Sequence, residues 1–310
     1  MANSDLKHFQ QTTNDTEKQF TDTLSHYRKR VEQTLTNVIL THHTVTPLLC
    51  DAMLYATLNG GKRLRPMLVY ATAYSFGSTD PSLDYIAAAI ECMHSFSLIH
   101  DDLPAMDDDT LRRGKATCHI LFGEATAILA GDALQTLSFE LLSRKDTAQS
   151  PVTQIQLIQI LARHSGTHGM AGGQSLDLLA EGKTLSAAEI EHIHALKTGG
   201  LIRASILMGA IGAGCTDESV LTRLDQFAER VGLAFQLQDD VLDITGTSKN
   251  FGKTIGQDIK NQKATYAILL GIENTQNRIH QLMAEAMSLI QSLPQTACFL
   301  ERYCRQLIKV

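Results

Sequence analysis

The sequence predicts an all-α protein, and three observations support this fold class. None of the six prolines lies between Val152 and Leu293, which favours long helices because an interior proline removes a backbone hydrogen bond. Apolar residues recur at helical spacing in many windows. Alternating apolar and polar runs bounded by tight-turn residues, the pattern of strands, are hard to find. We therefore expect about ten or more helices.

Several elements can be placed along the chain. Residues 1–15 are polar and are expected to be frayed. Apolar residues at steps of three and four predict one helix over residues 83–100 and another over residues 218–244. No linker rich in Ser, Pro or Gly divides the chain, so residues 1–310 are expected to form a single domain.

The composition, with 44% hydrophobic and 19% charged residues, is typical of a globular protein with a sizeable core. The net charge of −6 argues against a general nucleic-acid binder. No stretch approaches the ~18 uninterrupted apolar residues that indicate a membrane span, and Met1–Phe20 lacks the apolar centre of a signal peptide. The six cysteines form no CxxC pair, which argues against a disulfide framework or a zinc site. A cytoplasmic location is therefore expected.

The densest chemical signal is a cluster of five aspartates within residues 101–109, directly after the apolar run of the first helix. Like charges this close repel one another, so the crowding is favourable only where cations bind. Mg²⁺ prefers oxygen ligands and is usually held by carboxylates together with substrate phosphates. Pro104 is expected to end or distort the helix and to turn Asp107 back towards Asp101.

A second acidic cluster, Asp239, Asp240 and Asp243, lies at the end of the helix expected over residues 218–244. Residues four apart on a helix point in directions about 40° apart, so Asp239 and Asp243 share a face with Asp240 beside them. Two such clusters, each ending an apolar helical run, predict divalent cations with a polyphosphate between them.

Basic residues supply the further positive charge that a polyphosphate requires. Arginine suits bidentate binding of phosphate, and lysine acts as a point charge. The basic groups beside glycines or beside the acidic clusters are Lys62, Arg65, Arg112, Arg113, Lys197, Lys253 and Lys263. Gly246 and Gly252 enclose five residues rather than the four of an ATP-binding phosphate loop, which argues against an ATPase.

Five motifs in this order resemble the short-chain trans-prenyl diphosphate synthases, and among them most closely the bacterial farnesyl diphosphate synthases. They are GGKRLRP (60–66), DDLPAMDDDTLRRG (101–114), KTGGLIRA (197–204), FQLQDDVLD (235–243) and GKTIGQDIKNQKATY (252–266). The resemblance runs from near Ser25 to the C terminus. It implies a single-domain helical bundle of the isoprenoid-synthase type around a deep central cavity, usually as a homodimer.

The resemblance also implies roles for residues at matching positions. Three Mg²⁺ ions, with Mn²⁺ as an alternative, would be bound by Asp101, Asp102, Asp107, Asp239 and Asp243, with Asp240 nearby. The allylic diphosphate would be held by Arg112, Lys197, Thr198, Gln236, Lys253 and Lys263. Isopentenyl diphosphate would be held by Gly61, Lys62, Arg65, His94 and Arg113. The six aspartates, with Lys197 and Arg112, form the predicted catalytic set.

The implied reaction joins isopentenyl diphosphate to dimethylallyl or geranyl diphosphate and gives (2E,6E)-farnesyl diphosphate and pyrophosphate. Metal ions and cationic side chains would stabilise the departing pyrophosphate as the allylic bond ionises. Phe96, about 7.5 Å before Asp101 along the helix, would form the floor of the pocket for the growing chain, with Ser97 beside it. Ordinary core packing is the alternative role for Phe96.

Other functions stay open on the sequence alone. A geranylgeranyl diphosphate synthase would share these motifs, whereas a terpene cyclase generally lacks the GGKRLRP type of site and a regulatory subunit is expected to lose carboxylates. A metal-dependent phosphohydrolase built on His100, Asp101 and Asp102 would need further histidine ligands. The chain departs from the family at Ala116, where proline is common, which predicts a looser loop after Arg113. It also ends in a valine rather than in a basic residue.

Overall fold

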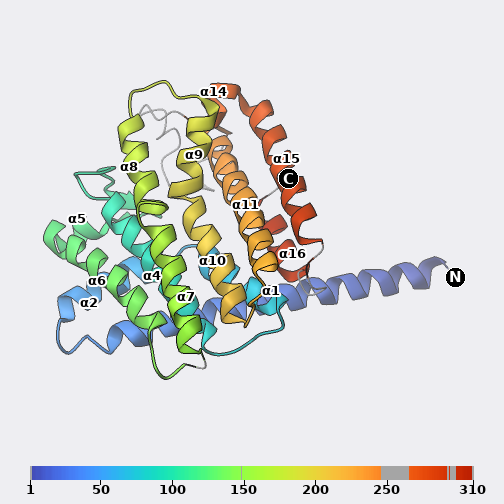
Figure 1. The fold of residues 1–310 in the computed structure, drawn as a ribbon, viewed down its shortest axis with the longest axis horizontal. Helices are drawn as coiled ribbons and strands as arrows, with labels where there is room; N and C mark the ends of the chain where they lie inside the picture. Colours follow the sequence, from blue (N-terminus) through green and yellow to red (C-terminus); the bar gives the residue numbers. More distant parts are fainter. Residues whose placement is uncertain (1, 148, 246–264, 292, 294–297, 309–310) are drawn as a thin grey trace.

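The computed structural model describes residues 2–147, 149–245, 265–291, 293 and 298–308, with side chains from residue 17 onward. It confirms the all-α prediction, because the regular secondary structure of the described residues is helical apart from one two-stranded hairpin (Figure 1). The elements are α1 (Ala2–Leu40), α2 (Pro47–Leu58), α3 (Leu64–Ser75), α4 (Leu83–Asp101), β1 (Leu111–Arg112), β2 (Lys115–Ala116), α5 (Cys118–Phe122), α6 (Glu124–Leu142), α7 (Pro151–Ser165), α8 (Met170–Ala180), α9 (Ala187–Lys197), α10 (Gly199–Gly212), α11 (Glu218–Thr245), α14 (Tyr266–Leu270), α15 (Ile272–Ile290) and α16 (Cys298–Leu307).

Helix α10 is the central element of the fold. Every residue of α10 except Arg203 is buried, and the helix packs against α3, α4, α7 and α11. Its glycines allow close approach: a Cβ at Gly209 would lie 2.5 Å from the carbonyl oxygen of Val69 on α3, and one at Gly212 would lie 2.5 Å from Ile86 on α4. This packing fixes α4 and α11, the two helices whose C-terminal ends carry the acidic clusters.

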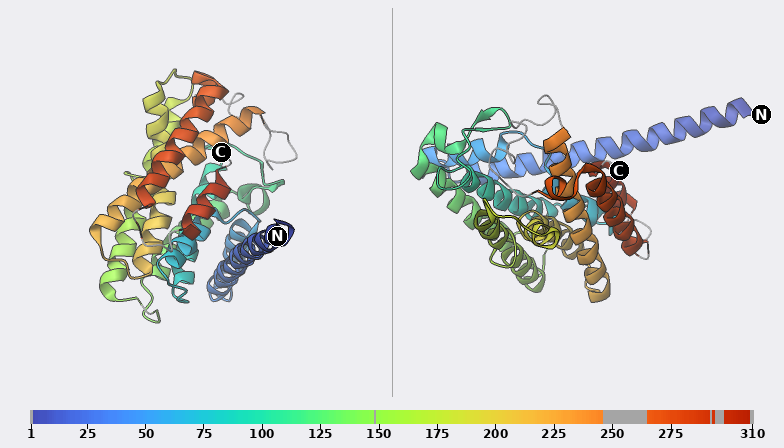
Figure 2. Two further views of the ribbon diagram at one scale, coloured as in Figure 1. Left: turned by 90° about the vertical axis from the view of Figure 1, so that its right-hand side faces the viewer. Right: turned by 90° about the horizontal axis from the view of Figure 1, so that it is seen from above.

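Helix α1 is the longest helix of the described chain. Its buried residues repeat every four positions from Tyr27 to Ile39 and lie against α2, α3 and α4. Residues 2–16 continue the same helix and project away from the other helices (Figures 1 and 2). No proline or glycine occurs before Pro47, so nothing in the backbone chemistry interrupts the helix.

A short hairpin follows the first acidic cluster, and the sequence pattern did not predict it. Strands β1 and β2 pair antiparallel. Arg113 and Gly114 between them have φ values of 55° and 76°, the positive values that a two-residue type I′ turn needs. The hydroxyl of Tyr55 donates to the carbonyl oxygen of Ala116 at 2.6 Å. These contacts restrain the loop although it has alanine where the family commonly has proline.

Among the helices of the described ranges, none combines the length and the apolar character needed to cross a membrane.

Candidate active site

The first acidic cluster lies where α4 ends. Buried residues such as Ile90 and Ile99 anchor this helix in the core, and its last residue is Asp101. The chain then turns back, and the backbone N–H of Asp107 donates to the carbonyl oxygen of Asp101 at 2.8 Å. The turn predicted at Pro104 is therefore present, and it brings the first and third aspartates of the predicted metal site together.

Asp102 is buried and ion-paired inside the protein. Its two carboxylate oxygens accept hydrogen bonds from Nε of Arg112, both at 2.8 Å, and Oδ1 also accepts from Nη2 at 2.5 Å. The side chains are only 4% and 15% exposed. Such bidentate pairs fix both partners in position. The family resemblance implies that Asp102 binds metal and that Arg112 binds a diphosphate. In the structure, these two side chains are hydrogen-bonded to each other.

Asp101 lies among charges of both signs. Burial raises the pKa of Asp101 to about 6, the positive charge of Lys197 opposes that shift, and the negative charge of Asp107 adds to it. Lys197, the last residue of α9, is therefore close enough to the end of α4 to act on its carboxylate. Crowded, partly desolvated carboxylates of this kind are typical of cation-binding and catalytic sites.

In the second cluster, Asp240 on α11 is the inner carboxylate and is 2% exposed. Its Oδ2 accepts from Nε2 of His194 at 3.2 Å and from the backbone N–H of Tyr266 at 3.1 Å. Its Oδ1 accepts from the side-chain amide of Gln236 at 3.3 Å. Because these donors belong to α9, α14 and α11, Asp240 ties three helices together.

The other two aspartates of the second cluster are more accessible. Asp239 is exposed, and Asp243 is half-buried. Four residues apart on α11, they share a face of the helix, as the sequence predicted. The Oδ2 atom of Asp243 is buried and has no hydrogen-bond partner among the described residues. A buried carboxylate oxygen without a hydrogen-bond partner is unfavourable unless a bound cation takes the place of that partner.

The break between α9 and α10 lies between the two clusters. The ammonium group of Lys197 donates to Asp177 on α8 at 2.7 Å. Gly173 allows α8 to come this close, since a Cβ there would lie 2.2 Å from the backbone nitrogen of Lys197. Next along the chain, the hydroxyl of Thr198 donates to Oε1 of Gln236 at 2.8 Å. The charge of Lys197 also acts on Asp101 in the first cluster, and Thr198 is bonded to the helix that carries the second.

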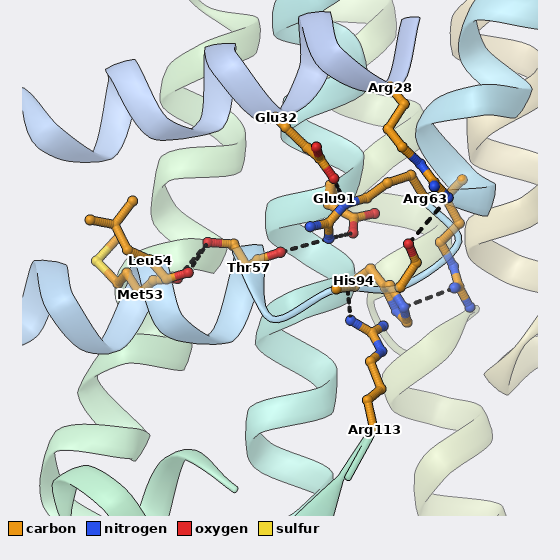
Figure 3. Close-up of polar contacts among 12 residues, drawn as sticks. Arg28, Glu32, Met53, Leu54, Thr57, Arg63, Glu91, His94 and Arg113 are labelled. Atoms are coloured by element: carbon orange, nitrogen blue, oxygen red, sulfur yellow. Dashed lines mark hydrogen bonds and ion pairs between the residues drawn. The ribbon is translucent and has the colours of Figure 1, made fainter. Parts of the chain in front are cut away.

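The loop between α2 and α3 is anchored by a buried arginine. Arg63 has a left-handed φ of 52° and is 3% exposed. Its guanidinium donates to Glu32 on α1 at 3.1 Å, to Glu91 on α4 at 2.7 Å and to the carbonyl oxygen of Thr57 on α2 at 2.6 Å (Figure 3). Arg63 thus fixes the loop to three helices, because its guanidinium forms these hydrogen bonds within the protein.

Further cations converge on the glycines of the same loop. Nη1 of Arg113 donates to the carbonyl oxygen of Gly60 at 2.6 Å, and Nη2 of Arg28 donates to that of Gly61 at 3.3 Å. A Cβ at Gly61 would lie 2.6 Å from the guanidinium of Arg113, so only glycine fits without displacing it. The side chain of Lys62 is exposed beside them. The loop is therefore surrounded by positive charge.

Arg65 and His94 lie near Arg113, and we call the group of Lys62, Arg65, His94 and Arg113 the arginine-rich pocket. Nη1 of Arg65 lies 3.1 Å from Nε2 of His94. Burial lowers the pKa of Arg65 to about 10, and burial together with the charges of Arg65 and Arg113 lowers the pKa of His94. The imidazole is therefore neutral, and Nε2 accepts from the arginine. Nε of Arg65 and Nδ1 of His94 are buried and have no partner among the described residues, as expected of groups that bind an anionic ligand.

Comparison with known proteins identifies the family. Residues 46–296 match the family model described as polyprenyl synthetase. The chain is 53% identical to farnesyl diphosphate synthase of Escherichia coli over 253 residues, which covers 81% of this chain and 83% of that protein. The chain belongs to the polyprenyl synthetase family.

Two crystal structures support this assignment at the level of the fold. A geranyltransferase from Legionella pneumophila superposes with a TM-score of 0.83 at 35% identity, over 94% of this chain and 98% of that one. A geranyltransferase from Helicobacter pylori, complexed with magnesium and isoprenyl diphosphate, superposes with a TM-score of 0.79 at 35% identity, over 92% of this chain and 95% of that one.

In this polyprenyl synthetase, Phe96 and Ser97 lie one turn before the first acidic cluster on α4. The Phe96 ring is half-buried and packs edge-on against the imidazole of His100, with ring centroids 4.8 Å apart. The hydroxyl of Ser97 donates to the carbonyl oxygen of His94 within the same helix at 2.9 Å. Lys253 and Lys263, the other two residues predicted to hold the allylic diphosphate, lie outside the described residues.

Sequence reasoning did not select three residues that organise this polyprenyl synthetase site: Arg63, Glu91 and His194. Arg63 lies inside the GGKRLRP motif, and the motif could have pointed to it. Glu91 and His194 carry no local signal, because their partners Arg63 and Asp240 lie 28 and 46 residues away in the chain.

Proposed function

We propose that this protein is a farnesyl diphosphate synthase, which joins isopentenyl diphosphate to dimethylallyl or geranyl diphosphate. The observation that carries the proposal is the arrangement of two acidic clusters around the Lys197–Thr198 break, with a separate arginine-rich pocket nearby. The charge of Asp239 acts on the pKa of Arg65 in that pocket. Acidic clusters suit a metal-bound diphosphate, and an arginine-rich pocket suits a second diphosphate bound directly. The name of the Escherichia coli relative supports the product.

The chemistry of the donor set fits Mg²⁺, with Mn²⁺ as an alternative. Asp101, Asp107, Asp239 and Asp243 offer the hard oxygen ligands that Mg²⁺ prefers, and the buried Oδ2 of Asp243 has no partner among the described residues. Three bound ions would supply positive charge that stabilises the departing pyrophosphate. The sequence also predicted Asp102 as a ligand; its pair with Arg112 supports a role in holding the hairpin against the cluster.

Residues at the α9–α10 break would bind the allylic substrate and favour its ionisation. Lys197 provides a positive charge, and Thr198 and Gln236, bonded to each other, provide fixed dipoles beside it. As the allylic C–O bond breaks, its electron pair leaves with pyrophosphate and the allylic carbon becomes a cation. Preorganised charges and dipoles stabilise such a transition state because they need no reorganisation at the moment of reaction. Arg112 contributes from the hairpin.

The arginine-rich pocket would hold isopentenyl diphosphate through Lys62, Arg65, His94 and Arg113, next to Gly61. The double bond of this substrate attacks the allylic cation and forms the new C–C bond, and a proton is then lost from the product. His94 is a poor proton acceptor, because burial and two arginines lower its pKa. The released pyrophosphate is the better base, which agrees with the lack of a dedicated basic side chain among the described site residues.

Phe96 would limit the length of the product. Its half-buried ring lies along α4 before Asp101, where an aromatic side chain would block further growth of the isoprenoid chain. The apolar walls around it would also keep water from the cation.

We also propose that the chain acts as a single domain and as a homodimer in the cytoplasm. Four large apolar side chains on the consecutive helices α5 and α6 support self-association: Ile120, Leu121, Ile128 and Leu129 are 53%, 54%, 42% and 57% exposed. Exposed apolar groups gathered on one surface are typical of a protein–protein interface.

A product assay tests the proposed function. Purified protein is incubated with geranyl diphosphate, isopentenyl diphosphate and Mg²⁺, and the dephosphorylated products are separated by chain length. We expect a fifteen-carbon alcohol that disappears with a chelator, and longer products from Phe96→Ala. Phe139→Ala is the matched control, because Phe139 is also a partly buried aromatic but lies on α6.

The possible outcomes of this assay separate the alternatives. A twenty-carbon product from the unmodified protein would keep the transfer reaction and contradict the role of Phe96. Hydrolysis of geranyl diphosphate without condensation would contradict the proposed function itself.

A further inference from the structure

Gln174 on α8 has an environment that the site described above does not explain. Its side chain is 9% exposed, and neither its amide oxygen nor its amide nitrogen has a hydrogen-bond partner among the described residues. A primary amide can donate two hydrogen bonds and accept two. Buried polar groups are almost always paired, so a whole amide without a partner needs a specific reason.

The other buried side-chain atoms that lack a partner in the described chain indicate what that reason is. They belong to Asn59, Arg65, His94 and Asp243. Arg65 and His94 lie in the arginine-rich pocket, Asp243 lies in the second acidic cluster, and Asn59 directly precedes the two glycines of the anchored loop. Unpartnered buried atoms therefore gather at the proposed ligand sites, and Gln174 is the one such residue of the described chain that lies outside the arginine-rich pocket, its loop and the acidic clusters.

Gly173 and Asp177, on either side of Gln174 in the chain, both pack against Lys197. A Cβ at the preceding residue, Gly173, would lie 2.2 Å from the Lys197 backbone nitrogen, and Asp177 accepts from the Lys197 ammonium at 2.7 Å. On a helix, Asp177 points about 40° from Gly173 and about 60° from Gln174. Gln174 therefore lies on the edge of α8 that borders the Lys197 side chain, whose charge acts on Asp101.

We propose that Gln174 is a further substrate-contacting residue, whose amide is satisfied by the reacting end of the allylic diphosphate. This inference rests on the proposed function. The amide N–H groups donate to a diphosphate oxygen, and the carbonyl dipole faces the allylic carbon, where positive charge develops. A neutral amide serves both partners, whereas a carboxylate at this position would repel the diphosphate. Because the amide is unpartnered without substrate, Gln174 destabilises the substrate-free protein.

The test replaces the amide with an apolar side chain of similar size, Gln174→Leu. The melting temperature of the substrate-free protein is expected to rise by about 2 °C or more, because an unpartnered buried amide is removed. The affinity for the non-reactive analogue geranyl thiolodiphosphate, measured by calorimetry with Mg²⁺, is expected to fall about tenfold or more. The KM for isopentenyl diphosphate is expected to stay within about twofold, since that substrate binds in the other pocket.

Gln149→Leu is the matched control, because the amide of Gln149 is paired: its Nε2 donates to the Ser82 hydroxyl at 2.9 Å and to the carbonyl oxygen of Gly212 at 3.0 Å. This variant is expected to lower the melting temperature and to leave the affinity for the analogue unchanged. If the branched leucine at position 174 does not fold, the unbranched Gln174→Met repeats the test.

Unchanged affinity for the analogue in a folded Gln174 variant would overturn the inference, and so would a loss of stability like that of Gln149→Leu. Binding of the analogue requires no turnover. A wild-type protein that binds the analogue but makes no fifteen-carbon product would contradict the proposed function while leaving the contact with Gln174 testable.

Discussion

The two acidic clusters resemble each other in sequence and differ in how the protein holds the inner carboxylate. In the first cluster, Asp102 forms a bidentate ion pair with the guanidinium of Arg112. In the second, Asp240 accepts from three separate donors, an imidazole, a side-chain amide and a backbone N–H. The first inner carboxylate fixes a hairpin, and the second fixes the ends of three helices.

We infer from this difference that the aspartates of each cluster have different roles. The inner residue of each adjacent pair, Asp102 or Asp240, is buried, and its carboxylate forms hydrogen bonds with other groups of the protein. Asp101 and Asp243 have environments suited to a cation: a raised pKa in one case and a buried oxygen without a partner in the described chain in the other. We therefore propose that the outer carboxylates, those of Asp101 and Asp243, bind metal and that the inner ones, those of Asp102 and Asp240, position them.

Removal of an outer carboxylate is expected to have the largest effect. Asp101→Asn and Asp243→Asn should each lower kcat with both substrates by about 10³-fold or more, because each removes a ligand of ions that contribute several kcal/mol of charge stabilisation. Steady-state kinetics at saturating Mg²⁺ measures this. Asp22→Asn, at an exposed position on α1, is the control and should leave kcat within about twofold. Full activity in either site variant would remove that residue from the metal site.

Replacement of the inner carboxylate should lower the free energy of unfolding by a different amount in each cluster. Asp102→Asn is expected to lower the free energy of unfolding by about 3 kcal/mol, because it leaves Arg112 without its counter-ion in a buried site. Asp240→Asn should cost only about 1–2 kcal/mol, since one of its two polar atoms can still accept. Urea denaturation measures both values. Equal losses in the two variants would contradict the distinction drawn between an ion pair and a set of separate donors.

The third effect concerns pH. Burial raises the pKa of Asp101 to about 6, above the ~3.9 of an unfolded chain. Between these values the folded protein holds more protons than the unfolded chain, so the free energy of unfolding falls as pH rises from about 4 to about 6 and is level above. The contribution is at most about 3 kcal/mol.

Urea denaturation of the metal-free protein at pH 4.5 and 7 checks this sign against Asp101→Asn, which does not titrate in this range. Asp101→Asn should gain stability relative to the wild type as the pH rises. A difference in stability between the two proteins that is the same at both pH values would contradict the raised pKa.

Most of the fold could be predicted from the sequence, because helical spacing is a local signal. The helices at 83–101 and 218–245 follow from their apolar repeats. The β1–β2 hairpin could not be predicted, because strands of two residues are too short to alternate visibly.

The candidate site divides in the same way between local and long-range signals. The return of Asp107 to Asp101 could be predicted from Pro104, which lies between them. The internal bonding of Asp240 could not, since His194 and Tyr266 lie 46 and 26 residues away and meet it only when α9, α11 and α14 pack together.

The most direct test of these separate roles, metal binding and positioning, is a count of bound metal ions. Mn²⁺ is titrated into the protein with excess inorganic pyrophosphate, and the free ion is measured by electron paramagnetic resonance. We predict three bound ions in the wild type, the same number in Asp102→Asn and Asp240→Asn, and fewer in Asp101→Asn and Asp243→Asn. A loss of ions in Asp240→Asn as large as that in Asp243→Asn, or no pyrophosphate-dependent binding in the wild type, would contradict this prediction.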